Sequence, residues 1–163
     1  MSLRTSRTVV GSLLLAVGLM AAACAQRREG TGSPSSDPEL ANRGSIEVTA
    51  RLVEVPDGAI FKRDQYNYAT VLKYEVLEVH RGSVKGQTIY VGHYNPFKPR
   101  SEAADQRVQG IGGNLKSFHA GQVHHMALEG SMLDHFTGGI LNKYSEEDTD
   151  PIYWGVWTNL VSG

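Results

Sequence analysis

The sequence contains one cysteine, Cys24, and this scarcity limits its covalent chemistry. One thiol cannot form an intramolecular disulfide or a multi-cysteine zinc site. The sequence also lacks an excess of positive charge, because 16 Lys and Arg face 17 Asp and Glu. Without such an excess there is no bulk electrostatic attraction to a phosphate backbone. Nucleic acid is therefore not an expected partner.

Motifs for nucleophilic catalysis and for nucleotide binding are missing. There is no Gly-x-Ser-x-Gly motif to present an activated serine. The glycine-rich run 110–114 is not followed by Gly-Lys-Ser/Thr, which favours a flexible loop over a phosphate loop. The acidic run Glu146, Glu147, Asp148 and Asp150 offers oxygen ligands for calcium, but it lacks the spacing of an EF-hand loop. A solvated acidic turn is the favoured interpretation, and we expect no cofactor.

The sequence also has no apolar run long enough to remain in a bilayer. The longest run extends from about Thr8 to Ala23, below the roughly 20 residues that a membrane-spanning helix needs. Arg4 and Arg7 precede it, and small residues end it. This order predicts a removable signal peptide over residues 1–23. Two alternatives stay open: cleavage near Ala23 that leaves a free thiol, and an uncleaved anchor helix.

The residues around Cys24 point to lipid attachment. Ala21-Ala22-Ala23 directly before Cys24 resembles the lipobox of bacterial lipoproteins, although that pattern more often has leucine where Ala21 stands. The resemblance implies that Cys24 receives a diacylglycerol and that, after cleavage, its new amino group receives a fatty acid such as palmitate. Several acyl chains give stable anchoring. Ala25 is not the aspartate associated with inner-membrane retention, which favours the periplasmic side of the outer membrane.

A polar stretch separates the cysteine from the folded part. Residues 25–44 contain scarcely an apolar side chain, so they cannot offset the entropy of ordering the chain. We therefore expect a flexible linker over residues 24–44, with a root-mean-square reach of roughly 25 Å, and a folded domain over residues 45–163. Removal of Arg4 and Arg7 with the leader leaves that mature chain with a formal charge of −3.

The folded part shows the alternation of β-strands. Ile46, Val48, Ala50 and Leu52 alternate with polar residues, and the phase then changes at Val53. The run 66–80 changes phase in the same way after Val76, which predicts bulged, strongly coiled strands. Further strands are expected at 88–94, 124–129 and 152–157, joined by a glycine turn at 81–86 and a long loop over 100–118 with a short helix near 101–107. Five such strands predict a small five-stranded OB-like barrel, with a β-sandwich as the alternative.

A second resemblance concerns the domain itself. The sequence from Tyr74 to Gly82, followed by Lys85-Gly86 and 89–91, looks like the hairpin of bacterial domains related to the netrin and tissue-inhibitor-of-metalloproteinase OB folds. Residues 118–121 resemble the entry to their fourth strand. The resemblance implies the fold alone, because OB folds carry unrelated functions. Metalloproteinase inhibition is not carried over, since Cys24 is far from the barrel.

Two groups of side chains are candidate sites. Four of the six histidines lie between positions 119 and 135, and with Glu129 they make a possible metal set: His119, His124, His125, His135 and Glu129. Neighbouring strand residues point to opposite faces, so His124 and His125 do not converge without a bulge, and ordinary strand and loop roles are favoured. The second group is aromatic. With Trp154 expected in the core beside Ile152 and Val156, the exposed aromatics would be Tyr153, Trp157, Tyr90 and Tyr94, which could stack on sugars or peptides.

These observations favour a lipid-anchored module of the cell envelope that binds or assembles without catalysis. Its partners would be the membrane, through the lipid on Cys24, and an envelope protein or a polysaccharide. A metal-dependent envelope enzyme built on the histidines is the alternative. Nucleic-acid binding ranks third, because export and negative charge both oppose it.

Overall fold

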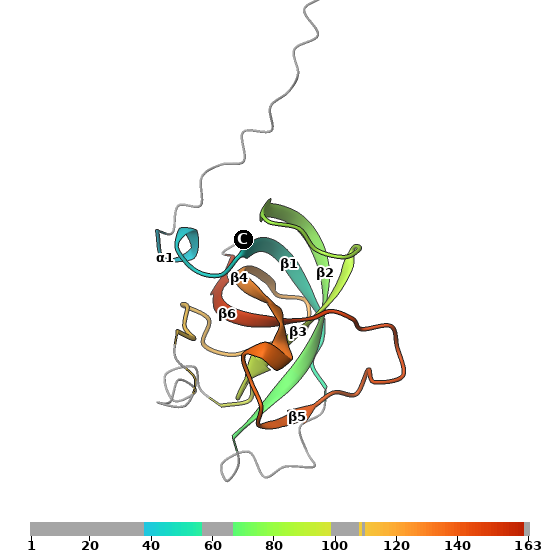
Figure 1. Cartoon of the computed structure of the whole chain (residues 1–163). Coiled ribbons are helices and arrows are strands. Elements are labelled where there is room, and N and C mark those ends of the chain that lie inside the picture. The colour runs from blue at the N-terminus through green and yellow to red at the C-terminus, as the bar shows by residue number, and fades with distance from the viewer. Residues whose placement is uncertain (1–37, 57–66, 99–107, 109, 162–163) are drawn as a thin grey trace, which may run out of the picture. The chain divides into compact units, whose positions relative to one another are not determined.

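The structure is a computed structural model that describes residues 38–56, 67–98, 108 and 110–161 (Figure 1). The predicted signal peptide, Cys24, most of the linker and the predicted helix near 101–107 lie outside these ranges. Within them no helix combines the length and apolar character needed to cross a membrane. The strands are β1 (Ile46–Glu54), β2 (Tyr68–Arg81), β3 (Thr88–Tyr94), β4 (Val123–Ser131), β5 (Gly139–Leu141) and β6 (Ile152–Leu160), with α1 at Pro38–Ala41 and the 3-10 helix η1 at Met132–Asp134.

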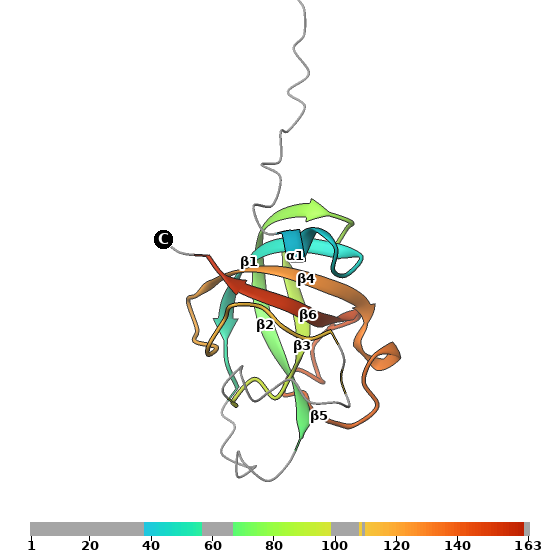
Figure 2. The same ribbon diagram turned by 90° about the vertical axis from the view of Figure 1, so that its left-hand side faces the viewer.

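Five of the strands close into a barrel, as predicted. They follow the order β1-β4-β6-β3-β2, and β2 pairs back onto β1. The β3–β6 contact is parallel, from Tyr90↔Ile152 to Gly92↔Trp154, and the other barrel contacts are antiparallel. Figure 2 shows β4 and β6 crossing β2 and β3 at a steep angle. This is an OB-like arrangement, in which closure leaves the barrel strands paired on both sides over most of their length.

Bulges supply the coiling that the phase changes predicted. In the β1–β2 ladder, Leu77 is the extra residue opposite the step from Thr49 to Ala50, and Val53 is the extra residue on β1. A third irregularity leaves His80 as an extra residue near the end of β2. Each extra residue increases the local twist. Val53 and Leu77 are exposed apolar side chains, and the pairing of β1 with β2 shifts by one residue at each of them.

The inward-facing residues form one core, called here the interior cluster. It consists of Ile46, Val48, Ala50, Leu52, Leu72, Tyr74, Ile89, Val91, Leu115, Phe118, Met126, Leu128 and Tyr153. The predicted alternation on β1, on β2 up to Tyr74 and on β3 is confirmed by this set. Each fully buried aliphatic side chain contributes about 1.5–3 kcal/mol relative to an exposed one.

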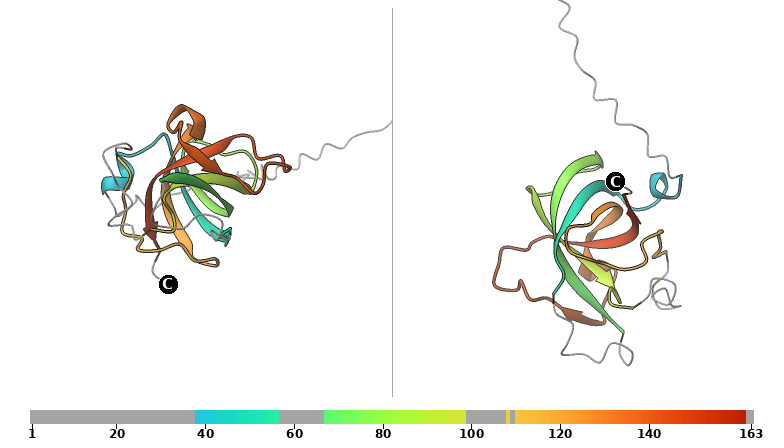
Figure 3. Two further views of the ribbon diagram at one scale, coloured as in Figure 1. Left: turned by 90° about the horizontal axis from the view of Figure 1, so that it is seen from below. Right: turned by 180° about the vertical axis from the view of Figure 1, so that it is seen from behind.

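A second core, the outer cluster, covers the outer surface of β2, β3 and β6. Its members are Ala69, Val71, Tyr90, Tyr94, Val108, Ile111, Met132, Phe136, Tyr144 and Trp154. Strand β5, which was not predicted, pairs in parallel with β2 from Tyr68↔Gly139 to Thr70↔Leu141. It holds the connection between β4 and β6 against the barrel. Part of that connection loops out beside the barrel, as Figure 3 shows from below and from behind.

The beginning of the domain differs from the predicted linker boundary at residue 44. Residues 38–41 form α1, and the side chain of Leu40 is fully buried. The Arg81 guanidinium donates hydrogen bonds to the carbonyls of residues 40, 41, 43 and 44 and to the Glu47 carboxylate. The linker prediction was therefore wrong for residues 38–44. The few apolar residues of this stretch suggested disorder, but one buried leucine and hydrogen bonds from an arginine of β2 are enough to order it.

Candidate functional site

The four aromatic residues predicted as an exposed binding face do not form one. Tyr90, Tyr94 and Tyr153 are 7%, 1% and 5% exposed. Trp157 is half-buried, with the Arg43 guanidinium 4.7 Å from its ring centroid. The prediction assumed that β3 and β6 have one buried face, whereas both of their faces are covered over most of their length. Trp154 is in the core as predicted, but in the outer cluster, while Tyr153 occupies the interior cluster.

Burial of these aromatics also covers the surface that OB folds commonly use for ligands, the outer face of the second and third strands. Tyr94 contacts Phe136, with 5.5 Å between ring centroids, and Tyr90 contacts Tyr144 at 5.2 Å. Phe136 in turn stacks on Trp154 at 5.6 Å with nearly parallel rings. The protein's own connection between β4 and β6 thus occupies this face.

The five predicted metal candidates are scattered. His124 is fully buried inside the barrel, whereas His125 lies on the outer surface and bonds Glu47 at 2.8 Å. His119 bonds Ser117, and His135 is exposed after η1. Glu129 accepts a hydrogen bond from Ser45. Across the described part of the chain, no three or more His, Cys, Asp or Glu side chains gather as a metal site.

The histidines instead enter a buried hydrogen-bonded chain that the sequence did not predict. Tyr74 Oη lies 3.1 Å from His93 Nε2 and 3.2 Å from His124 Nδ1. His124 Nε2 lies 3.1 Å from Gln122 Oε1, which also accepts from the His119 backbone N–H at 2.9 Å. An oxygen that accepts from a backbone N–H fixes the direction of the remaining bonds. His124 donates to Gln122, Tyr74 donates to His124, and His93 donates to Tyr74.

The barrel interior near this chain is buried and tightly packed. Burial lowers the pKa of His124 to about 4, so its imidazole is neutral at pH 7. Thr70, the strand partner of His93, has a buried hydroxyl with no hydrogen-bond partner. Gly155 lies against His93, where an added Cβ would be 2.6 Å from the ring. The interior therefore contains a tightly packed polar core within an apolar one.

Two loops identified in the sequence have structural roles. Gly112 lies against the ring of Trp157, and Gly113 has φ +118° beside the Thr158 backbone, where a side chain would clash. In the acidic run, Glu147 binds Lys73 at 3.0 Å and accepts a hydrogen bond from Tyr90. The favoured interpretations were a flexible loop and a solvated acidic turn. Gly112 and Gly113 instead pack closely against β6, and Glu147 is anchored to β2 and β3.

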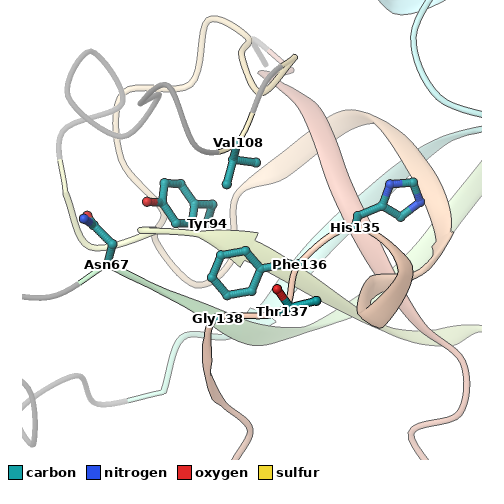
Figure 4. A pocket seen from close by; sticks show the side chains of 7 residues that line it. All are labelled: Asn67, Tyr94, Val108, His135, Phe136, Thr137 and Gly138. Atoms are coloured by element: carbon teal, nitrogen blue, oxygen red, sulfur yellow. The ribbon is translucent and has the colours of Figure 1, made fainter.

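A cavity of about 250 Å³ lies beside the outer cluster and is the best candidate for a binding site (Figure 4). Its apolar wall consists of Tyr94, Val108 and Phe136, which lie close together between Asn67 and Thr137. Asn67 Oδ1 already accepts from Asn95 and Lys98. The cavity is thus bordered by two largely buried aromatic side chains, with Asn67, His135 and Thr137 among its polar lining residues. A ligand site commonly combines these two features.

The connection between β4 and β6 supplies most of the residues that line this cavity. Its sequence has no alternation of apolar and polar residues from which the cavity could have been predicted. Phe136 and Gly138 line it from a segment with a single three-residue strand. Comparison of the chain with protein-family models, with curated proteins and with solved structures finds no match.

Proposed function

We propose that the chain is an exported lipoprotein that holds its barrel at the cell envelope as a binding or assembly module. The observation that carries this proposal is Cys24 itself, placed directly after a short apolar segment that ends in three alanines. A segment of that length suits a cleaved signal peptide rather than a permanent span. Acyl chains on Cys24 then anchor the mature protein.

The barrel supports binding rather than catalysis. His93 and His124 are engaged inside the barrel, His80 and His125 pair with their rings 4.8 Å apart, and no group of three or more potential metal ligands forms among the described residues. The surface offers instead the cavity walled by Tyr94 and Phe136. A wall of this kind suits a sugar unit of an envelope polysaccharide or an apolar side chain of an envelope protein.

Membrane fractionation tests the anchor. The native chain is expected in the membrane fraction and resistant to high-salt washing, because buried acyl chains are insensitive to ionic screening. Cys24→Ser removes the acylated thiol and is expected to move the protein out of that fraction. An equal membrane share for the two proteins would contradict the proposal. Ser33→Ala, a substitution in the linker, is the matched control and should change nothing.

A second experiment tests the cavity as the binding surface. Thr137 is exposed and lines the cavity, so Thr137→Arg is expected to fill it and to abolish retention of envelope glycans or envelope proteins on the immobilised chain. Leu133→Arg places the same charge on the nearby η1, where the side chain is 65% exposed and does not line the cavity. Equal retention by both variants would locate binding elsewhere.

A further inference from the structure

A polar cluster lies on the outer face of β1, between β4 and the last residues of β2. β1 pairs with both of these strands, and Thr49 has His125 of β4 and Glu78 of β2 as its partners. Thr49 Oγ1 lies 2.8 Å from His80 Nε2. The rings of His80 and His125 lie 4.8 Å apart between centroids. Two imidazoles from two separate strands therefore meet above a third strand.

A β-bulge in β2 shapes this face. Val79 pairs with Val48 of the interior cluster. Regular alternation from Val79 would turn His80 outward and Arg81 back toward the interior. The extra residue at the bulge keeps Arg81 outward as well, where its guanidinium bonds the Glu47 carboxylate at 3.0 Å. The bulge therefore places two consecutive side chains of β2, His80 and Arg81, beside the outward residues of β1.

Each of the two imidazoles has its Nε2 atom held by a neighbour on β1. His125 Nε2 lies 2.8 Å from Glu47 Oε1, and an ionised carboxylate only accepts, so this nitrogen carries a proton. The neutral His125 ring then has its lone pair on Nδ1. Thr49 Oγ1 holds His80 in the same way when His80 Nε2 is the donor. Among the residues that the structure describes, no hydrogen bond reaches Nδ1 of either ring.

These contacts resemble the surroundings of metal-binding histidines. A ligating imidazole commonly donates its other N–H to a carboxylate or another oxygen, which fixes the orientation of the ring. Glu47 is that acceptor for His125, and Thr49 is that acceptor for His80. With metal–nitrogen bonds of about 2.0–2.1 Å, two imidazoles on one ion at an angle of about 90–109° have centroids about 4.5–5.2 Å apart. The 4.8 Å separation of the two rings lies within this range.

The charges and the exposure of the pair suit a cation from solvent. The Glu78 carboxylate lies 3.7 Å from His80 Nδ1. Arg81 is paired with Glu47 at 3.0 Å, so the positive charge of its guanidinium is balanced by that carboxylate. Glu78 then adds a negative charge beside the two rings. The side chains of His80 and His125 are 18% and 20% exposed, which gives an ion access to them.

We propose that His80 and His125 bind one divalent transition-metal ion through their Nδ1 atoms, with water completing the coordination. Imidazole ligands suit Cu²⁺, Ni²⁺ and Zn²⁺, and Cu²⁺ binds most tightly in this series. The two protein ligands are fewer than the four of a structural zinc site, so the ion exchanges with solvent. The bound ion joins β2 to β4 across β1. This site is separate from the lipid anchor and from the cavity walled by Tyr94 and Phe136.

Titration of the full-length chain with Cu²⁺ alone tests the site, in a Cys24→Ser background without a histidine tag so that no thiol or added imidazole competes. One Cu²⁺ is expected to saturate each chain, with two imidazole nitrogens coupled to the ion in its electron paramagnetic resonance spectrum. His80→Asn and His125→Asn should each weaken binding about tenfold or more and leave one coupled nitrogen. Cu²⁺ should raise the unfolding temperature of the parent chain more than that of either variant.

Two further variants separate this pair from the other histidines, and unfolding without Cu²⁺ verifies that each variant folds. His135→Asn changes an exposed histidine after η1 and should bind Cu²⁺ as the parent chain does. Thr49→Val removes the acceptor of His80 Nε2, keeps both ligands, and should weaken binding about tenfold. The proposal is overturned if Cu²⁺ shows no saturable binding, if folded His80→Asn binds like the parent, or if His135→Asn weakens binding as much as His80→Asn.

Discussion

The interior cluster and the outer cluster are two cores of one small barrel, and they differ in how their residues come together. The interior cluster is assembled almost entirely from alternate residues of the strands, such as Val48, Leu72 and Val91. The outer cluster takes Phe136 and Tyr144 from connections that lie against the barrel. Local alternation therefore specifies the first core, while the second depends on contacts between residues far apart in sequence.

The sharpest test of this comparison is a cavity made in each core. Leu72→Ala, at a fully buried position of the interior cluster, is expected to lower the free energy of unfolding by about 2–5 kcal/mol. Phe136→Ala is expected to release residues 132–151 locally and to lower the barrel's own stability by less. Urea denaturation with hydrogen exchange separates the two effects. Equal loss of global stability would show that the clusters form a single cooperative core.

Acid is expected to act on the interior cluster through His124. Its folded pKa of about 4 lies below the ordinary 6.5, so the unfolded chain takes up the proton first. The contribution of neutral His124 to stability is complete above pH 6.5 and falls progressively to pH 4, by about 3 kcal/mol at most. The urea midpoint of the wild type is expected to fall more steeply between pH 6.5 and pH 4 than that of His124→Asn. Equal pH dependence of the two midpoints would mean that another group dominates.

A loss of stability of intermediate size is expected at the start of the domain, where Arg81 binds the residues before β1. Arg81→Ala removes the donor that holds the carbonyls of residues 40–44 and leaves Glu47 paired only with His125. We expect a loss of about 2 kcal/mol, because charged hydrogen bonds are lost and the nearly buried Glu47 carboxylate keeps only its bond to His125. Arg51→Ala, which breaks an exposed pair with Glu75, should cost less than about 1 kcal/mol. Thermal unfolding of both variants decides the order.

The smallest effect is expected at the rim of the outer cluster. Tyr144→Phe removes a hydroxyl that donates to Glu54 at 3.2 Å, and water can solvate that exposed carboxylate instead. The loss should be about 0.5 kcal/mol, at the low end for a hydrogen bond. A loss above about 2 kcal/mol would mean that this rim, rather than Phe136, holds the connection in place. Chemical denaturation measures the difference.

The barrel could be predicted from the sequence because its signals are local. Ile46 to Leu52 and Thr88 to Tyr94 alternate or carry strand-forming residues, and the phase changes at Val53 and Leu77 mark real bulges. A bulge moves a side chain by one position, which a period of two makes visible. The glycine turn at 81–86 was predictable for the same reason, since Gly82 and Gly86 adopt positive φ.

The candidate sites could not be predicted in the same way. His93 and His124 lie on different strands, and only the barrel's register brings both within 3.2 Å of the Tyr74 hydroxyl. Burial of Tyr90 and Tyr94 depends on a connection whose only regular strand is Gly139–Leu141. The type of a polar or aromatic residue does not indicate which residues it will contact. The candidate residues could therefore be identified from the sequence, but their partners could not.

Mass spectrometry of the native protein's N-terminal peptide tests most directly the proposal that a lipid on Cys24 holds the barrel at a membrane. The expected peptide begins at Cys24, carries a diacylglyceryl thioether on its sulfur and an acyl chain on its amino group, and lacks residues 1–23. A peptide with a free Cys24 thiol, or one that still contains the leader, would contradict it.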